Sequence, residues 1–200
     1  MKLEGGVIEV ESKSGFLTRQ QEVLAELEKT QKDFWNISRE SANFLSMLIK
    51  ISGVRKVVEV GTSNGYSGIW IAQALKDSVN YKGHLTTIEY YEKRIVLAQE
   101  NFKKCGVDDI ITIMQGSACD VLKILNYGLE FVFLDANKSE YIEYFDIINP
   151  KMRIGGIIVA DNITSHADKV APFVEKIKSD PDYQLEILDL PGGMLVAYKL

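Results

Sequence analysis

The sequence predicts an α/β fold, a Rossmann-like, seven-stranded and mostly parallel sheet with helices on both faces. Three observations support this prediction. Short apolar runs alternate with longer segments of helical period, and repeated strand–helix–strand units build a parallel sheet. The expected strands are almost continuously apolar, as strands covered on both faces must be. Near the C-terminus, the Pro-Gly-Gly connection at 191–193 has no room for a crossover helix. It therefore predicts an antiparallel hairpin at the end of the sheet.

The expected elements follow in order along the chain. We expect strands at 56–61, 84–89, 111–114, 131–135, 156–160, 185–188 and 194–199. We expect helices between them at 65–76, 91–105, 117–126, 139–148 and 166–179. In the second of these helices, Ile95, Ala98 and Phe102 recur at spacings of three and four, as an amphipathic helix requires. Two further helices, at 17–33 and 38–52, are expected to precede the sheet as an N-terminal extension.

Composition narrows the class of protein. The 200 residues suit one domain, expected to span 1–200, and no Gly/Ser-rich linker divides them. The net charge of −5, without a block of Lys or Arg, argues against broad nucleic-acid binding. No apolar run is long enough to span a bilayer, and residues 1–15 lack the apolar core of a signal peptide, so we expect a cytoplasmic protein. Cys105 and Cys119 show no metal spacing and are expected to be free thiols.

Acidic side chains follow most of the expected parallel strands. Because the carboxyl ends of parallel strands meet at one edge of the sheet, where ligands bind, these residues should lie close together. Carboxylates gathered in this way repel one another unless cations or hydroxyl donors bind among them. The sequence therefore predicts a binding site at this edge. The strand ends carry Glu59, Glu89, Gly116-Ser117, Asp135 and Asp161-Asn162.

A glycine-rich loop, EVGTSNGYSG at 59–68, separates the first strand from its helix. Its glycines allow a ligand to approach the backbone at a helix N-terminus. The spacing is neither GxGxxG nor GxxxxGK[ST], which argues against a nicotinamide dinucleotide and a P-loop. Glu59 beside the loop favours a cation or hydroxyl donors over a pyrophosphate, and Glu89 is placed to accept from ribose hydroxyls. S-adenosylmethionine meets both demands; the alternatives are a helix-capping turn for the loop and a solvated acid for Glu89.

Four segments in order then show a resemblance: VVEVGTSNGYSG, TIEYYEKR, FVFLDANKSEY and GGIIVADNI. They resemble the class I S-adenosylmethionine-dependent O-methyltransferases, and most closely the cation-dependent branch that includes catechol and caffeoyl-CoA O-methyltransferases. The resemblance runs from about residue 36 to the C-terminus. The D-x-x-K motif and the D-N pair, each after its own strand, are more specific than the glycine loop.

The resemblance implies a set of site residues. Lys138 would be the general base, and Asp135, Asp161 and Asn162 would hold a divalent cation. Two carboxylates and an amide oxygen are hard ligands that suit Mg²⁺, with Mn²⁺ and Ca²⁺ as alternatives. A dication also disfavours the charged form of a nearby amine, which would free Lys138 to accept a proton. The residues implied for cofactor binding are Ile37, Glu59, Gly61, Ser63, Tyr66, Ser67, Glu89, Gly116, Ser117, Ala118 and Asp135.

Several alternatives stay open at this stage. Taken singly, Asp161-Asn162 is typical of a turn, Asp135 of a helix cap and Lys138 of a solvated side chain. The expected substrate is a small molecule with vicinal hydroxyls; a hydroxylated uridine of transfer RNA and a non-catalytic cofactor-binding module are the other hypotheses. We also expect a homodimer, as is usual in this family, formed through the helices at 17–52.

Substrate identity depends on residues where the sequence departs from the family. Ala136 and Asn137 stand where catechol O-methyltransferase has bulky aromatic residues, which weakens the expected apolar wall for a flat ring. His166 is expected to be a surface residue at a helix start, with a substrate contact as the alternative.

Overall fold

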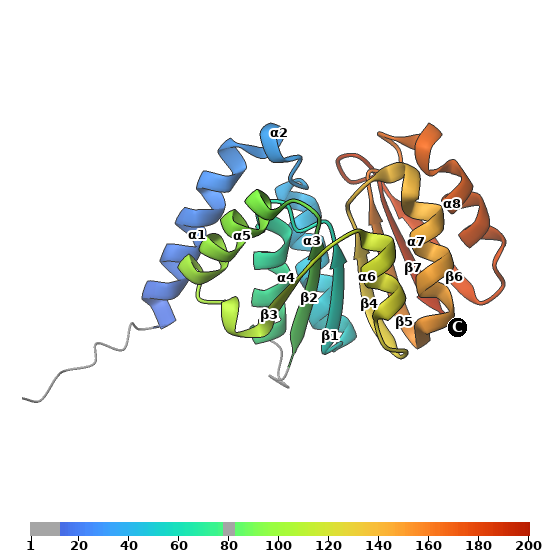
Figure 1. Ribbon diagram of the computed structural model, residues 1–200, viewed down its shortest axis with the longest axis horizontal. Helices are drawn as coiled ribbons and strands as arrows, with labels where there is room; N and C mark the ends of the chain where they lie inside the picture. Colours follow the sequence, from blue (N-terminus) through green and yellow to red (C-terminus); the bar gives the residue numbers. More distant parts are fainter. Residues whose placement is uncertain (1–12, 78–82) are drawn as a thin grey trace, which may run out of the picture.

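The computed structural model describes residues 13–77 and 83–200, and seven strands form one sheet within these ranges (Figure 1). The strand order is β3-β2-β1-β4-β5-β7-β6. Strands β1 to β5 pair in parallel, whereas β7 pairs antiparallel with both β5 and β6. The predicted fold class is therefore confirmed. The strands are β1 Lys56–Val60, β2 His84–Glu89, β3 Ile111–Gln115, β4 Leu129–Leu134, β5 Met152–Asp161, β6 Tyr183–Leu188 and β7 Met194–Lys199.

The helices match the predicted positions with one clear exception. The helix predicted at 17–33 is interrupted: α1 ends at Lys29, and the short helix α2 begins at Gln31. The cause lies at the carbonyl of Leu27. It accepts hydrogen bonds from the Thr30 hydroxyl and from the side-chain amide of Asn36, each at 3.1 Å. Side chains of this kind compete with helix propagation. The helices are α1 Lys13–Lys29, α2 Gln31–Phe34, α3 Arg39–Ser52, α4 Tyr66–Asp77, α5 Glu92–Lys104, α6 Ala118–Ile124, α7 Tyr141–Ile148 and α8 Ala167–Ser179.

Alternation along each strand divides the core into two layers. Val57 and Phe133 belong to the apolar cluster that lies under α1, α3, α4 and α5. Val58 and Leu134 belong to the opposite cluster, under α6, α7 and α8. Figure 1 shows these two groups of helices on the two faces of the sheet. Because both faces are covered, the rigid sheet fixes the positions of its strand ends.

Close backbone packing joins the loop after β1 to the end of β4. Gly61 has φ of +108°, and a side chain there would overlap the carbonyl oxygen of Asp135. The amide of Asp135 in turn donates to the carbonyl of Val60 at 2.9 Å. Glycine is therefore required at 61, because it permits both the backbone angle and the contact. This contact holds the glycine loop beside the residues that follow β4.

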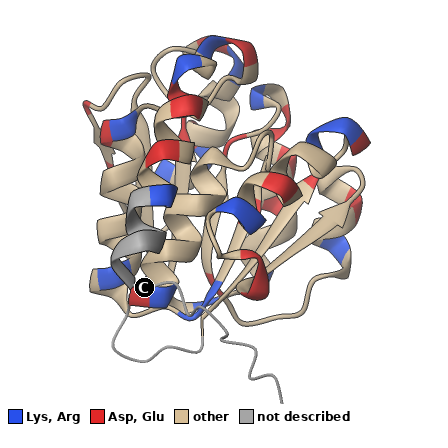
Figure 2. Cartoon of the chain, turned by 90° about the vertical axis from the view of Figure 1, so that its left-hand side faces the viewer, with Lys and Arg blue, Asp and Glu red and all other residues tan. Residues whose placement is uncertain are grey.

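The structure also bears on three exclusions made from the sequence. Cys105 and Cys119 are free, as predicted, and both are buried. In the described ranges, no helix combines the length and apolar character needed to cross a membrane. Figure 2 shows acidic and basic residues interspersed over the visible elements rather than separated by sign. The expectation of no signal peptide in residues 1–15 concerns a segment that lies mostly outside the described ranges.

Candidate active site

A cavity of about 960 Å³ lies at the edge of the sheet where the parallel strands end. Three groups of residues line it: the segment around α2, the loops after β1, β2 and β3, and the loops after β4 and β5. Most of the residues implied by the resemblance meet there. They are Ile37, Gly61, Ser63, Tyr66, Ser67, Glu89, Gly116, Ser117, Ala118, Asp135, Lys138 and Asn162.

Glu89, at the end of β2, is held by the backbone around it. Its carboxylate accepts hydrogen bonds from the amides of Ser63 at 2.9 Å, Tyr90 at 2.9 Å and Tyr91 at 3.0 Å. The residue is 6% exposed. It is therefore a fixed group facing the cavity, not a solvated acid at a strand end. A carboxylate has about four acceptor sites, so it can still accept from a ligand hydroxyl.

Glu59 lies deeper than predicted. It is fully buried and does not line the cavity. One carboxylate oxygen accepts from the Ser67 hydroxyl at 2.5 Å, and the other accepts from the Thr87 hydroxyl at 2.6 Å. Burial raises the pKa of Glu59 to about 7, although these two hydrogen bonds act in the opposite direction. Glu59 thus reaches the cavity through other residues, among them Ser67, which lines it.

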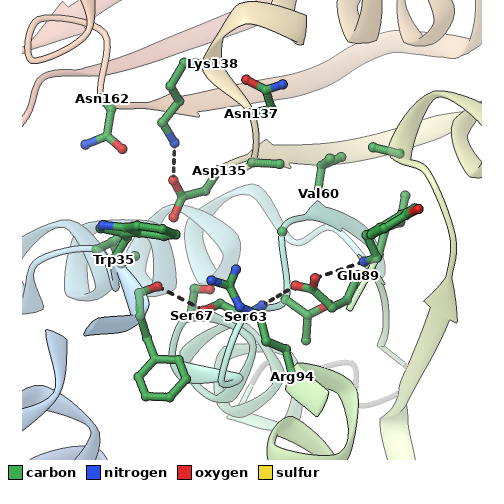
Figure 3. A pocket seen from close by; sticks show the side chains of 18 of the residues that line it. Trp35, Val60, Ser63, Ser67, Glu89, Arg94, Asp135, Asn137, Lys138 and Asn162 are labelled. Atoms are coloured by element: carbon green, nitrogen blue, oxygen red, sulfur yellow. Dashed lines mark hydrogen bonds and ion pairs between the residues drawn. The ribbon is translucent and has the colours of Figure 1, made fainter. Parts of the chain in front are cut away.

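Asp135 and Lys138 form an ion pair inside the cavity (Figure 3). The Lys138 Nζ atom lies 2.6 Å from Asp135 Oδ1, and the two side chains are only 12% and 11% exposed. Burial raises the pKa of Asp135, and the Lys138 ammonium offsets part of that rise. Lys138 also lies 5.4 Å above the centre of the Tyr141 ring. Lys138 is therefore not a solvated lysine, and Asp135 is more than a helix cap.

Asp161, at the end of β5, is a buried acid with an unsatisfied oxygen. It is 2% exposed, and its Oδ1 atom has no hydrogen-bond partner among the described residues. Burial raises the pKa of Asp161 to about 7, and the charge of Asp135 contributes to the rise. The Tyr141 hydroxyl donates to the carbonyls of Leu134 at 2.8 Å and Asp161 at 3.3 Å, which ties the ends of β4 and β5 together.

Asn162 follows directly, with φ of 62°, a backbone conformation that asparagine tolerates better than most residues. The turn between β6 and β7 packs closely against it, because a side chain at Gly192 would come within 2.8 Å of Asn162 Nδ2. Asn162 lines the cavity, whereas Asp161 lies behind the lining.

The donor set of Asp135, Asp161 and Asn162 fits a hard divalent cation. Burial raises the pKa of both carboxyls, and the charge of Asp135 adds to the rise at Asp161, so a nearby cation would stabilise their ionised forms. Lys138 supplies only one positive charge. Carboxylate and amide oxygens are the ligands such cations prefer. Within the described ranges, no group of three or more His, Cys, Asp or Glu side chains is placed to hold a metal. The set of Asp135, Asp161 and Asn162 has only two side chains of these four types, because its third member is an amide.

Comparison with known proteins now identifies the family. The O-methyltransferase family matches residues 12–200. The chain belongs to this family. A catechol O-methyltransferase of Niastella koreensis is 35% identical over 132 residues, which cover 64% of this chain and 58% of that protein. A caffeoyl-CoA O-methyltransferase of Medicago sativa is 33% identical over 164 residues, which cover 77% of this chain and 65% of that protein. The chain thus spans less than two thirds of the length of these two relatives.

Other relatives match over more of their length. Tapetum-specific methyltransferase 1 of Arabidopsis thaliana is 34% identical, with 91% of this chain and 88% of that protein covered. Among solved structures, an O-methyltransferase from Bacillus cereus in complex with SAH superimposes with a TM-score of 0.80 at 24% identity, covering 96% and 94%. An SAH-bound methyltransferase of Podospora anserina superimposes with a TM-score of 0.80 at 21% identity, and the match covers both chains fully. These structures support the fold.

Sequence reasoning missed part of the cavity wall. Trp35, Tyr91, Arg94 and Lys169 line it but were not predicted. The predicted helix at 17–33 left Trp35 as a short connector, and no pattern in the sequence brings it to Arg94. The exposed His166 also lines the cavity, so it combines a surface position with access to a ligand.

Proposed function

We propose that this protein is a divalent-cation-dependent O-methyltransferase that transfers the methyl group of S-adenosylmethionine to a hydroxyl of a small catechol-like diol. One observation carries the proposal: a single cavity holds the backbone-fixed Glu89 at one side and the Asp135–Lys138 pair at the other. The family match supports methyl transfer. The relatives named for catechol and caffeoyl-CoA support a small hydroxylated acceptor.

The cofactor would occupy the half of the cavity around the glycine loop. S-adenosylmethionine supplies a methyl group bonded to a positively charged sulfur. Glu89 would accept from the ribose hydroxyls, and Ser117 and Ala118 would line the adenine. Ser67, backed by Glu59, would contact the methionine portion together with Ile37. Two solved structures of the same fold are complexes with SAH and SAM, which supports S-adenosylmethionine as the cofactor.

The acceptor would occupy the other half, beside Asp135. A bound divalent cation would lower the pKa of an acceptor hydroxyl by the effect that acidifies metal-bound water. Asp135, Asp161 and Asn162 would hold this cation. With a cation beside it, the Lys138 ammonium would leave Asp135 and lose its proton to solvent, and the neutral amine would then take the hydroxyl proton. The cavity walls would align the resulting oxygen nucleophile with the methyl group, since orientation alone removes a large part of such barriers.

The two alternative functions, a transfer-RNA methyltransferase and a non-catalytic binding module, have less support. The net charge of −5 and relatives named for catechol and caffeoyl-CoA give no support to a transfer-RNA substrate. A non-catalytic binding module leaves the largely buried Lys138 without a role. We retain, as proposals, a homodimer formed through residues 17–52, one domain over 1–200 and a cytoplasmic location.

A panel of diols tests the proposed function directly. The protein, stripped of metal, is assayed with S-adenosylmethionine and catechol, protocatechuate or caffeate, with and without Mg²⁺, and SAH binding is measured by calorimetry. We expect methyl transfer that EDTA abolishes and excess Mg²⁺ restores. SAH binding without chelator-sensitive transfer to any diol would refute the proposal.

A further inference from the structure

Asn162 differs from the two carboxylates of the proposed cation site in how its position is fixed. Asp161 belongs to β5, and the backbone amide of Asp135 bonds to Val60 of β1. Asn162 follows the end of β5 in a left-handed backbone conformation, with φ of 62°. Among the described residues, its side chain has no hydrogen-bond partner. The orientation of its amide therefore depends on packing.

The turn between β6 and β7 packs against the loop that follows β5. The register of β5 and β7 pairs Asp161 with Met194, which brings the glycines of the turn beside this loop. The carbonyl of Gly193 accepts from the Ile163 amide at 3.0 Å. The carbonyl of Gly192 accepts from the next two amides along the chain, at 2.9 and 3.1 Å. These backbone hydrogen bonds hold the loop and the turn together.

The turn itself has the residues and the hydrogen bond of a type II turn. Pro191 stands at its second position and Gly192 at its third, where φ is +89°. The amide of Gly193 donates to the carbonyl of Leu190 at 2.7 Å. A type II turn needs a positive φ at the third position, and proline presets the angle at the second. The turn is therefore a fixed surface against which Asn162 packs.

The Asn162 amide packs directly against Gly192, with its nitrogen facing the turn. A side-chain carbon at 192 would lie 2.8 Å from Asn162 Nδ2, whereas the next atoms, Ser165 Oγ and Asn162 Cα, would lie at 3.4 and 3.7 Å. The nitrogen thus uses the space that the missing side chain leaves. Figure 3 shows the amide oxygen turned towards Lys138 and Asp135. This oxygen is the end of the amide that can bind a cation, because the nitrogen only donates.

From these observations, we propose that the turn at 191–193 is a positioning element of the cation site. Gly192, by lacking a side chain, lets the Asn162 amide lie with its oxygen facing the cation. The inference rests on the proposed function and adds the C-terminal hairpin to the support of that site. An added side chain at 192 would meet the mobile end of Asn162, so the amide would shift and the loop would stay. At Gly193, by contrast, it would meet the backbone nitrogen of Thr164 at 2.9 Å.

Gly192→Ala tests the turn, and Gly128→Ala is its matched control. Both glycines have a positive φ, of +89° and +85°, but a side chain at 128 would meet nothing within 4 Å, and Gly128 lies outside the cavity. Mn²⁺ is titrated by calorimetry into each full-length protein with SAH bound. We expect Gly192→Ala to weaken Mn²⁺ binding about tenfold, the usual effect of losing a group that orients a metal ligand. Gly128→Ala should bind Mn²⁺ as the wild type does.

Two further measurements exclude a general loss of structure. SAH affinity should equal the wild-type value in both variants, and both should lose similar stability in urea, because both place alanine at a positive φ. Gly192→Asn carries the same added carbon, and asparagine is accepted at the third position of a type II turn. It should therefore fold at least as well as Gly192→Ala and weaken Mn²⁺ binding in the same way.

A double-mutant cycle shows whether Gly192 acts through Asn162. Asn162→Gly removes the amide and accepts the positive φ, and in this background Gly192→Ala should not weaken Mn²⁺ binding further. If these affinities are found but no diol is methylated, the proposed function fails and the positioning role stands. Equal Mn²⁺ affinity in Gly192→Ala and Gly128→Ala, additive effects in the cycle, or no Mn²⁺ binding by the wild type would overturn the positioning role.

Discussion

Replacing Glu59 with Gln tests whether this buried acid lowers stability at neutral pH. Glu59 is fully buried in the layer under α4, and its pKa is raised mainly by burial. Gln keeps the shape and cannot ionise. It can accept from Ser67, as the carboxylate does, and donate to Thr87. Thr87 would then donate to Thr62, whose hydroxyl lies 2.6 Å away. The hydrogen-bonded chain therefore survives the substitution in reversed direction.

The magnitude follows from the two protonation equilibria. The pKa of Glu59 is about 7 in the folded protein and has a usual value of 4.5, so the folded state binds the proton more tightly. The stability contributed by the protonated form is fully present below pH 4.5 and is lost as the pH rises to about 7. At about 1.36 kcal/mol per pH unit over this interval, the complete loss is about 3 kcal/mol.

Urea denaturation of wild-type protein and Glu59→Gln at pH 5 and pH 8 measures this loss. We expect the free energy of unfolding of the variant, minus that of the wild type, to be about 2–3 kcal/mol larger at pH 8 than at pH 5, so that the variant is relatively more stable at pH 8. Taking the difference between the two proteins cancels the other titrating groups. The same difference at both pH values would refute the reasoning, because it would mean that Glu59 titrates alike in the folded and unfolded states.

Three further predictions concern the cavity. Asp161→Ala should abolish methyl transfer while leaving the calorimetric SAH affinity unchanged; weakened SAH binding would contradict its assignment to the acceptor half. Lys138→Ala should lower kcat about 100-fold at neutral pH and less at alkaline pH, where hydroxide can take the proton, so an equal deficit at both pH values would count against a general base. Gly61→Ala should cost about 3 kcal/mol in urea denaturation because of overlap with Asp135. Gly128→Ala, which has a positive φ but nothing within 4 Å, should cost clearly less.

The sheet and the part of the cavity around the glycine loop could be predicted because short-range patterns determine them. Apolar runs locate the strands, and parallel pairing then brings their carboxyl ends together. The alternation in β1 could also have shown that Glu59 does not line the cavity. Glu59 lies between Val58 and Val60, so its side chain must point to the opposite face of the sheet, towards α4. Gly68 on α4 provides the space, since a side chain there would approach the Glu59 carboxylate at 3.3 Å.

The cavity wall around Trp35 could not be predicted because tertiary contacts create it. The break after α1 depends on Asn36 reaching back to the carbonyl of Leu27. The position of Trp35 depends on Ser63, from a different loop, bonding to Phe34. Its orientation depends on Arg94 from α5. None of these pairs is marked by spacing or composition, so the helical pattern at 17–33 favoured one uninterrupted helix.

Three positions in this molecule break ordinary rules of stability: Trp35 lines the cavity, and Glu59 and Asp161 lie behind residues that line it. Among the described residues, Glu59 is a buried acid with no paired cation and Asp161 has a buried oxygen with no partner, while Trp35 combines strain with exposure. Each arrangement lowers the stability of the folded chain by a different physical cause. A sequence that specifies its fold consistently tends to break such rules where ligands bind. Their convergence on one cavity is therefore an argument for a functional site that is independent of the family match.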